Sequence, residues 1–157
     1  MKYPINFKEF NETFDFFEEV LIEFENAKNY LFSFKWCKEI KNTSLYFNLG
    51  SKLCIFLFEI ENTSRVDDSY LWVLVGDIPS MYLDINNTKT VREVLEDYVA
   101  LGEDWIKNIK LGKSINNCYP FQAEPTKEMA TLLENRTNFI KKTLLKNILD
   151  IKLQYFS

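Results

Sequence analysis

The residues best suited to chemistry in this 157-residue chain lie where an apolar segment ends in a turn. Residues 71–75 are all apolar, and Gly76-Asp77-Ile78-Pro79 follows them directly. A carboxylate held at the end of a strand can bind a cation or act as a general base. The same residues also suit a structural turn, because Gly permits unusual backbone angles, Asp bonds nearby amides and Pro ends the strand. We favour the structural turn, since no spacing in the sequence brings a second polar group to Asp77.

Imidazole chemistry is excluded, because the chain contains no histidine. This removes Ser-His-Asp and Cys-His mechanisms and histidine metal ligands. The three cysteines, Cys37, Cys54 and Cys118, are far apart and form no C-x-x-C pair. We therefore expect reduced and mostly buried thiols, with no disulfide framework, no metal and no cofactor. Aromatic residues at periodic positions, such as Trp72 and Tyr82, suit a core better than a ligand pocket.

Acidic side chains form the second candidate site. They gather in the N-terminal segment and in the polar loop 61–69 of a chain whose net charge is −4. This charge disfavours nucleic acid as a partner and favours a basic protein surface. The residues predicted to contact such a partner are Glu12, Asp15, Glu19, Glu23, Glu61, Asp67 and Asp68. The plainer interpretation is a solvated helix face and a polar hairpin loop that lacks the ligand spacing of a calcium site.

Apolar periodicity indicates the elements that must position these groups. Steps of three and four residues from Phe7 predict a helix over residues 6–30, capped by Asn6 or Asn11. Helical spacing returns over 91–109, with Thr88 or Thr90 as cap and Gly112 as stop, and over 125–148. Between the first two helices, alternation predicts short antiparallel strands near 32–40, 45–49, 53–60 and 71–75, joined by turns at 41–44 and 50–51.

The predicted fold class is α+β, with one domain over residues 1–157. It comprises an N-terminal helix, an antiparallel meander of four strands or slightly more, and two C-terminal helices packed on the sheet. Residues 53–60 are apolar on both faces, as in a central strand covered on both sides. The N-terminus has no signal-peptide core, and no apolar run reaches membrane-spanning length. We therefore expect a cytoplasmic protein without a membrane partner.

The segment 72–83 resembles a family of small uncharacterised bacterial proteins. Their pattern is a Trp-rich strand, Gly-Asp-Leu-Pro, two further residues and Tyr. The matching residues are Trp72, Gly76, Asp77, Pro79 and Tyr82, with Ile78 in place of Leu. Similar features outside it are Trp36-Cys37, the helix from Val91, Trp105, and the segment 124–130 ending near Arg136. The resemblance covers about residues 36–140. It implies a shared fold with the motif as a structural corner, and it supplies no known catalytic residue.

Small acidic α+β proteins without a catalytic constellation, from Asn-, Lys- and Phe-rich bacterial genomes, are often immunity proteins. We therefore predict a non-enzymatic protein that binds and neutralises a cognate bacterial toxin through its acidic surface. Two alternatives stay open. One is a small ligand-binding protein or enzyme with a pocket at the Gly-Asp-Ile-Pro turn, using Asp77 and Tyr82. The other is a homodimeric structural module.

Overall fold

A computed structural model describes residues 3–65 and 69–147 and shows an α+β fold. The chain forms two compact units, the first reaching to Val91 and the second beginning at Arg92. The first unit contains a five-stranded antiparallel sheet and one helix, and the second contains two long helices. A single domain over 1–157, and the packing of the C-terminal helices on the sheet, stay predictions.

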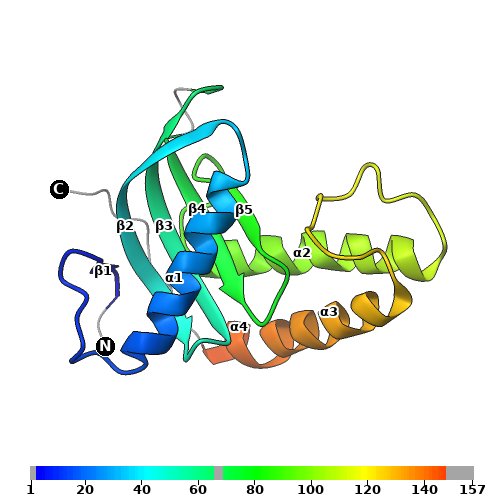
Figure 1. Cartoon of the computed structure of the whole chain (residues 1–157). Coiled ribbons are helices and arrows are strands. Elements are labelled where there is room, and N and C mark those ends of the chain that lie inside the picture. Colours follow the sequence, from blue (N-terminus) through cyan, green and yellow to red (C-terminus); the bar gives the residue numbers. More distant parts are fainter. Residues whose placement is uncertain (1–2, 66–68, 148–157) are drawn as a thin grey trace. The chain divides into compact units, whose positions relative to one another are not determined.

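The sheet is a meander in which each strand pairs with its neighbours in sequence, in the order β1-β2-β3-β4-β5 (Figure 1). The strands are Ile5–Asn6 (β1), Cys37–Leu49 (β2), Leu53–Asn62 (β3), Tyr70–Gly76 (β4) and Met81–Asp84 (β5). The antiparallel meander is thus confirmed. Residues 53–58 are all buried, which confirms the central position predicted for β3.

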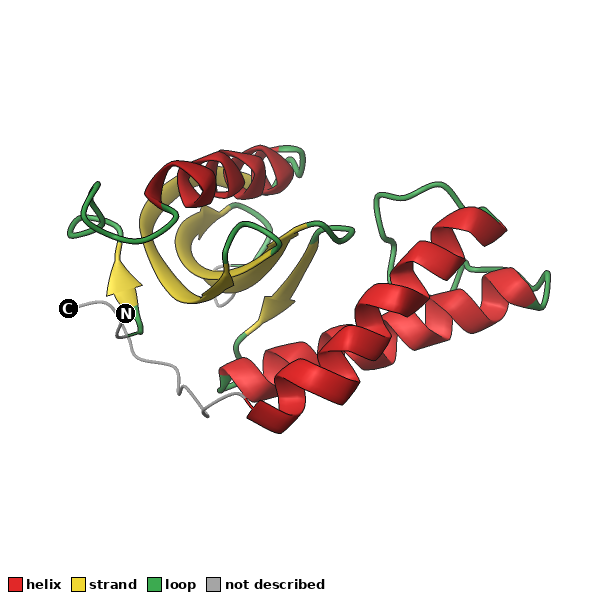
Figure 2. Cartoon of the chain, turned by 90° about the horizontal axis from the view of Figure 1, so that it is seen from below, coloured by secondary structure: helices red, strands yellow, loops and turns green. Residues whose placement is uncertain are grey.

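The first helix, α1 (Phe17–Phe32), lies across one face of this curved sheet (Figure 2). Its buried residues, which include Val20, Ala27 and Leu31, belong to the same apolar cluster as Phe56 and Phe58 of β3. Burying such side chains contributes about 1.5–3 kcal/mol each for a large aliphatic or aromatic group. The amphipathic character that predicted this helix therefore anchors it to the sheet.

The predicted start of the helix near residue 6 is wrong. Ile5 and Asn6 pair with β2 as a short strand, and the segment up to Phe16 forms turns. The two proposed caps make turns instead: Asn6 Oδ1 accepts from the Lys8 amide at 2.9 Å, and Asn11 Oδ1 accepts from the Thr13 amide at 3.0 Å. Asparagine often makes such local bonds, which compete with the helix.

Aromatic stacking explains why the sequence of the turn segment shows helical spacing of its apolar residues. The Phe7 and Phe10 rings stack at 4.8 Å between centroids, and Phe10 and Phe14 stack at 5.3 Å. Phe7 also contacts Phe24 of α1 at 4.4 Å. The apolar spacing of three and four residues thus arises from a cluster of rings in successive turns, not from a single helical face.

Two further predictions, one of a turn and one of a strand, are wrong. Residues 41–44 lie within β2 instead of forming a turn, and residue 32 ends α1 instead of beginning a strand. Polar residues are tolerated within β2 because the strand is bulged between Ile40 and Asn42, and the Asn42 amide donates to Glu59 Oε1 at 2.7 Å. The strand β5 was not predicted, since its four residues are too few to show a period.

The second unit contains α2 (Val91–Lys110) and α3 (Lys127–Phe139), followed by a π-helical turn Ile140–Leu144 (η1) and the short α4 (Leu145–Asn147). The predicted stop at Gly112 is confirmed by its positive φ of 66°. The predicted start of the last helix is confirmed by Thr126, whose side chain accepts from the Met129 amide at 3.1 Å.

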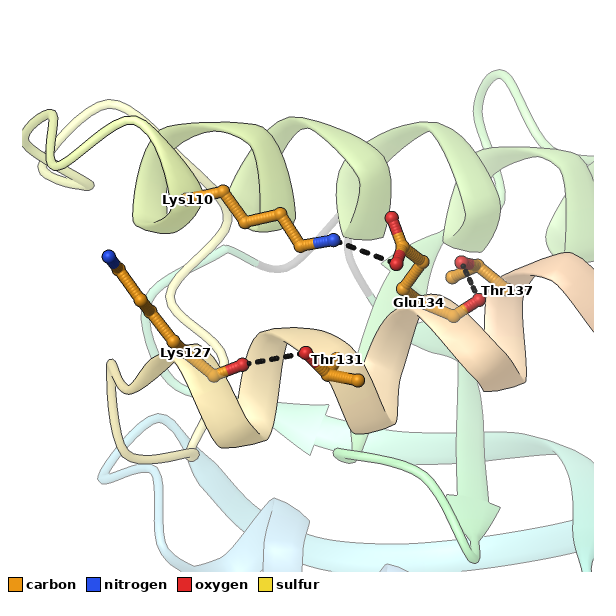
Figure 3. A network of polar contacts seen from close by, with 5 residues as sticks. All are labelled: Lys110, Lys127, Thr131, Glu134 and Thr137. Atoms are coloured by element: carbon orange, nitrogen blue, oxygen red, sulfur yellow. Dashed lines mark hydrogen bonds and ion pairs between the residues drawn. The ribbon is translucent and has the colours of Figure 1, made fainter.

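Close contact between α2 and α3 depends on Gly102, because a Cβ there would lie 3.0 Å from Thr137 Cγ2. Lys110 Nζ lies 2.7 Å from Glu134 Oε1, while Thr131 and Thr137 hydroxyls donate to backbone carbonyls of α3 (Figure 3). These polar contacts are exposed or half-buried, so the ion pair contributes about 0–1 kcal/mol. Packing therefore holds the pair of helices together more than charge does.

Candidate functional site

The Gly76-Asp77-Ile78-Pro79 turn is built by its backbone. Gly76 has a φ of 134°, and a Cβ there would overlap the Lys52 carbonyl oxygen and lie 2.6 Å from the Lys52 carbonyl carbon. The Asp77 amide donates to that same oxygen at 2.8 Å. The Asp77 side chain is exposed. Glycine is therefore required by the close approach of two backbones, and the turn needs no catalytic role to explain it.

Trp72 anchors the strand before this turn. Its side chain is fully buried, its indole Nε1 donates to the Thr88 carbonyl at 2.8 Å, and the Tyr46 ring packs edge-on at 4.8 Å. A buried indole N–H that finds an acceptor is the usual structural arrangement for tryptophan. This bond ties β4 to the segment that leads into α2.

Tyr82 lies on β5 and lines a cavity, but Asp77 is not part of that cavity. The Tyr82 ring meets Trp36 at 5.2 Å and Phe34 at 5.2 Å. The cavity has a volume of about 410 Å³. Its lining residues are Trp36, Asn62, Ser64, Arg65, Leu71, Tyr82, Leu83 and Asp84. In the register of β4 with β5, Asp84 lies opposite Leu71, at the end of the strand pair away from the turn. The structure thus separates Asp77 from the Tyr82 cavity.

Three of the predicted acidic residues lie close together at the start of α1. Glu12 and Asp15 lie in the turns before the helix, Glu19 lies in its first turn, and all three are exposed. Glu23 is one turn further along and half-buried, and this burial raises the pKa of its carboxyl above the ordinary value. The Asn26 amide partly opposes this by donating to Glu23 Oε1 at 3.3 Å.

The other predicted acids lie elsewhere. Glu61 is on β3 opposite Glu39, with Lys38 Nζ at 4.0 Å, and Asp67 and Asp68 lie outside the described residues. The start of α1 lies near the other end of β3, because Phe16 contacts Gly50 in the turn between β2 and β3. A ten-residue strand such as β3 spans about 30 Å. Glu61 and the acids of α1 therefore do not share one contact surface.

Two apolar residues missed by the sequence analysis accompany the acids of α1. Phe16 is 56% exposed and Ile22 is 61% exposed. Phe16 precedes α1 with a left-handed φ of 60°, and its carbonyl accepts the Val20 amide at 2.8 Å. A left-handed conformation is uncommon for a bulky residue, and nothing in the sequence indicates it. The available signal for an exposed ring was the pair Phe16-Phe17 between acidic residues, because a regular helix cannot bury the rings of two consecutive residues on one face.

The environments of the buried thiols do not favour reactivity. Cys37 and Cys54 are buried and free of disulfides, as predicted. Burial raises the thiol pKa of Cys37, and burial with the nearby Glu23 charge raises that of Cys54 to about 12. A thiol with a raised pKa is a poor nucleophile at neutral pH. Within residues 3–65 and 69–147, no three Cys, Asp or Glu side chains gather where they could hold a metal ion.

In comparisons with known proteins, no family model, no curated protein and no solved structure matches this chain. The resemblance of segment 72–83 to a bacterial family therefore stays a prediction. In the described part of the chain, no helix combines the length and apolar character needed to cross a membrane.

Proposed function

We propose that this chain is a non-enzymatic binding protein that docks the start of α1 on a basic protein surface, as an immunity protein docks on its toxin. The observation that carries this proposal is the exposed Phe16, which is flanked along the chain by the exposed acids Glu12, Asp15 and Glu19. We call Glu12, Asp15, Phe16, Glu19 and Ile22 the acidic-aromatic surface.

The composition of this surface suits protein recognition. Binding energy at protein interfaces concentrates in a few large apolar or aromatic anchors, and charges at the rim speed encounter and select the partner. Phe16 supplies the anchor and the three carboxylates supply the rim. Glu23 is a weaker candidate than in the sequence analysis, because its carboxyl is half-buried.

The backbone of Phe16 adds a second argument. A left-handed conformation costs about 1–2 kcal/mol for a residue with a Cβ. Glycine would adopt it without this cost, yet the chain places a half-exposed aromatic ring there. Local strain of this kind is concentrated at functional positions. The strain is accounted for if the ring is needed for contact with a partner.

Co-expression with the product of each neighbouring gene tests this function. The wild-type chain should restore growth to cells that express a toxic neighbour. The triple variant Glu12→Lys, Asp15→Lys, Glu19→Lys should not restore it, because the surface would then repel a basic partner. The matched control is Glu96→Lys, Glu124→Lys, Glu128→Lys, which makes the same change in net charge at exposed acids of the second unit. Equal rescue by the two variants would contradict the proposal. If no neighbouring gene product is neutralised and light scattering shows that the chain forms dimers, the structural module would be favoured instead.

A second candidate function, small-ligand binding, is favoured by the cavity beside Tyr82. This cavity combines the aromatic rings of Trp36 and Tyr82 with side chains of both charges, Arg65 and Asp84. Such a lining suits a small zwitterion with an apolar part. Thermal-shift measurements with the twenty free amino acids test it, because a bound ligand stabilises the folded state. If none of them raises the melting temperature, this candidate is lost.

A further inference from the structure

A groove between α1 and β2 has the opposite charge to the acidic-aromatic surface. It has a volume of about 560 Å³ and is formed by the second half of α1, the first half of β2 and the segment that follows β1. Its apolar lining includes Phe7, Phe24 and Phe32, and Phe32 is 49% exposed. An exposed phenylalanine in a concave surface is a natural seat for an apolar side chain of a partner.

Four lysines surround this apolar lining, and two of them have no ion-pair partner among the described residues. They are Lys8, Lys28, Lys38 and Lys41. Lys28 pairs with Glu25 at 3.0 Å and lies over the Phe24 ring at 4.8 Å, and Lys38 reaches Glu61 only at 4.0 Å. No described carboxylate lies within 4.0 Å of the exposed Lys8 or Lys41 ammonium groups. Glu39 is the one acid of this lining, so four lysines against one carboxylate give the groove a local positive charge on an acidic chain.

One wall of the groove is an open strand edge. β1 pairs only with Leu45 and Ser44, and the Phe7 amide bonds the Thr43 carbonyl at 3.0 Å. Upstream of Thr43, the outer edge of β2 has no partner strand within the described part of the chain. Two bulges and the lysines interrupt this edge, which disfavours edge-to-edge pairing of long strands. A short extended segment can still add to it.

From these features we infer that the groove between α1 and β2 binds a short acidic segment of another protein. One large apolar side chain of that segment lies against Phe7, Phe24 and Phe32. Carboxylates on either side of it meet the ammonium groups of Lys8 and Lys41. This surface is separate from the acidic-aromatic surface, and the inference does not depend on the proposed function.

Charge complementarity selects this occupant over others. A membrane or nucleic acid also attracts lysines, but each is an extended negative surface that would meet the acidic parts of the chain as well, whereas a short segment contacts the groove alone. The groove lining includes no arginine, the residue best suited to phosphate. A second copy of the chain, entering with its acidic-aromatic surface, is a different occupant that the experiment separates.

The test is an NMR titration of the full-length chain with an acetylated heptapeptide, Glu-Asp-Glu-Trp-Asp-Glu-Asp. We expect saturable shifts at the amides of Phe32 and of residues 38–43. The double variant Lys8→Gln, Lys41→Gln should weaken binding about tenfold, which corresponds to about 1.4 kcal/mol shared by two exposed ion pairs. The control Lys107→Gln, Lys113→Gln removes two exposed lysines of the second unit and should bind like the wild type. The same peptide with Ser in place of Trp should bind more weakly than the Trp peptide.

Several results would overturn the inference. The first is the absence of saturable shifts at the groove. Equal loss of binding in the two double variants would show that only net charge matters. Tighter binding of a thymidine oligonucleotide or of phosphatidylserine vesicles than of the peptide would assign the groove to those ligands. Shifts that depend on protein concentration alone would assign it to a second copy.

Discussion

Replacing Gly76 by alanine should destabilise the first unit strongly, because two separate costs fall on one residue. Its φ of 134° is unfavourable for any residue with a Cβ, at about 1–2 kcal/mol. The new Cβ would also overlap the Lys52 carbonyl, which is backbone and cannot rotate away. Relieving this overlap adds about 1–3 kcal/mol of strain, and it weakens the Asp77 amide bond to Lys52, which contributes about 1 kcal/mol. The expected total is about 3–6 kcal/mol.

Gly50→Ala is the matched control in the same sheet. Gly50 also has a left-handed φ, at 55°, but a Cβ there would meet only the Phe16 ring at 3.6 Å, an ordinary contact. This variant should therefore lose only the conformational term, about 1–2 kcal/mol. The difference between the two variants isolates the backbone overlap at Gly76.

The assay is urea unfolding of both variants, followed by far-ultraviolet circular dichroism and by tryptophan fluorescence. If the dependence of the unfolding free energy on urea concentration is unchanged and the urea midpoint is lower, the variant has lost stability without a change in the surface exposed on unfolding. A loss of about 3–6 kcal/mol is a large part of the roughly 5–15 kcal/mol that stabilises a typical domain. The reasoning fails if Gly76→Ala is no less stable than Gly50→Ala.

Three further changes test other parts of the structure. Trp72→Phe should lower the free energy of unfolding by about 2–4 kcal/mol in urea titrations, because it removes the bond to the Thr88 carbonyl and leaves a cavity. Thr126→Ala should cost about 1 kcal/mol, since the Met129 amide loses its cap, and thermal melts of the variant should show it. Burial raises the pKa of Glu23 above its ordinary value of 4.5, so the stability that its protonated form provides is lost as pH rises through the folded-state pKa. Glu23→Gln should therefore be more stable than the wild type at pH 7. Melts at falling pH should show this advantage shrinking as the pH passes through the raised folded-state pKa, and it should be gone below about pH 4.5.

The sequence was sufficient for the elements whose signals are local. The stop at Gly112 and the start of the last helix near residue 125 follow from residue type, and the central strand β3 follows from its apolar run. It was insufficient where distant contacts override the local pattern. The turns at Asn6 and Asn11 replace a helix because the phenylalanine rings pack on α1 and the sheet, which a one-dimensional period does not distinguish from a helical face.

The candidate site shows the same division. Sequence reasoning found the acids Glu12, Asp15 and Glu19, because charge is a property of the residue alone. It also assigned Glu61 to the same partner contact, because the sequence does not show how far apart two acidic segments lie. The register of the strands, which places Glu61, is needed for that. It missed Phe16, whose exposure depends on a backbone angle that no residue type dictates.

The most direct test of the proposed function is the affinity of the variant Phe16→Gly for the neighbouring-gene toxin, measured by isothermal titration calorimetry beside its stability. Glycine adopts the φ of 60° without strain, and this gain offsets the packing that is lost with the ring. The stability of the variant should therefore stay within about 1 kcal/mol of the wild type. We predict that affinity falls about 30-fold or more, as for an interface residue worth about 2 kcal/mol. A stable variant that binds the toxin as tightly as the wild type would contradict the account.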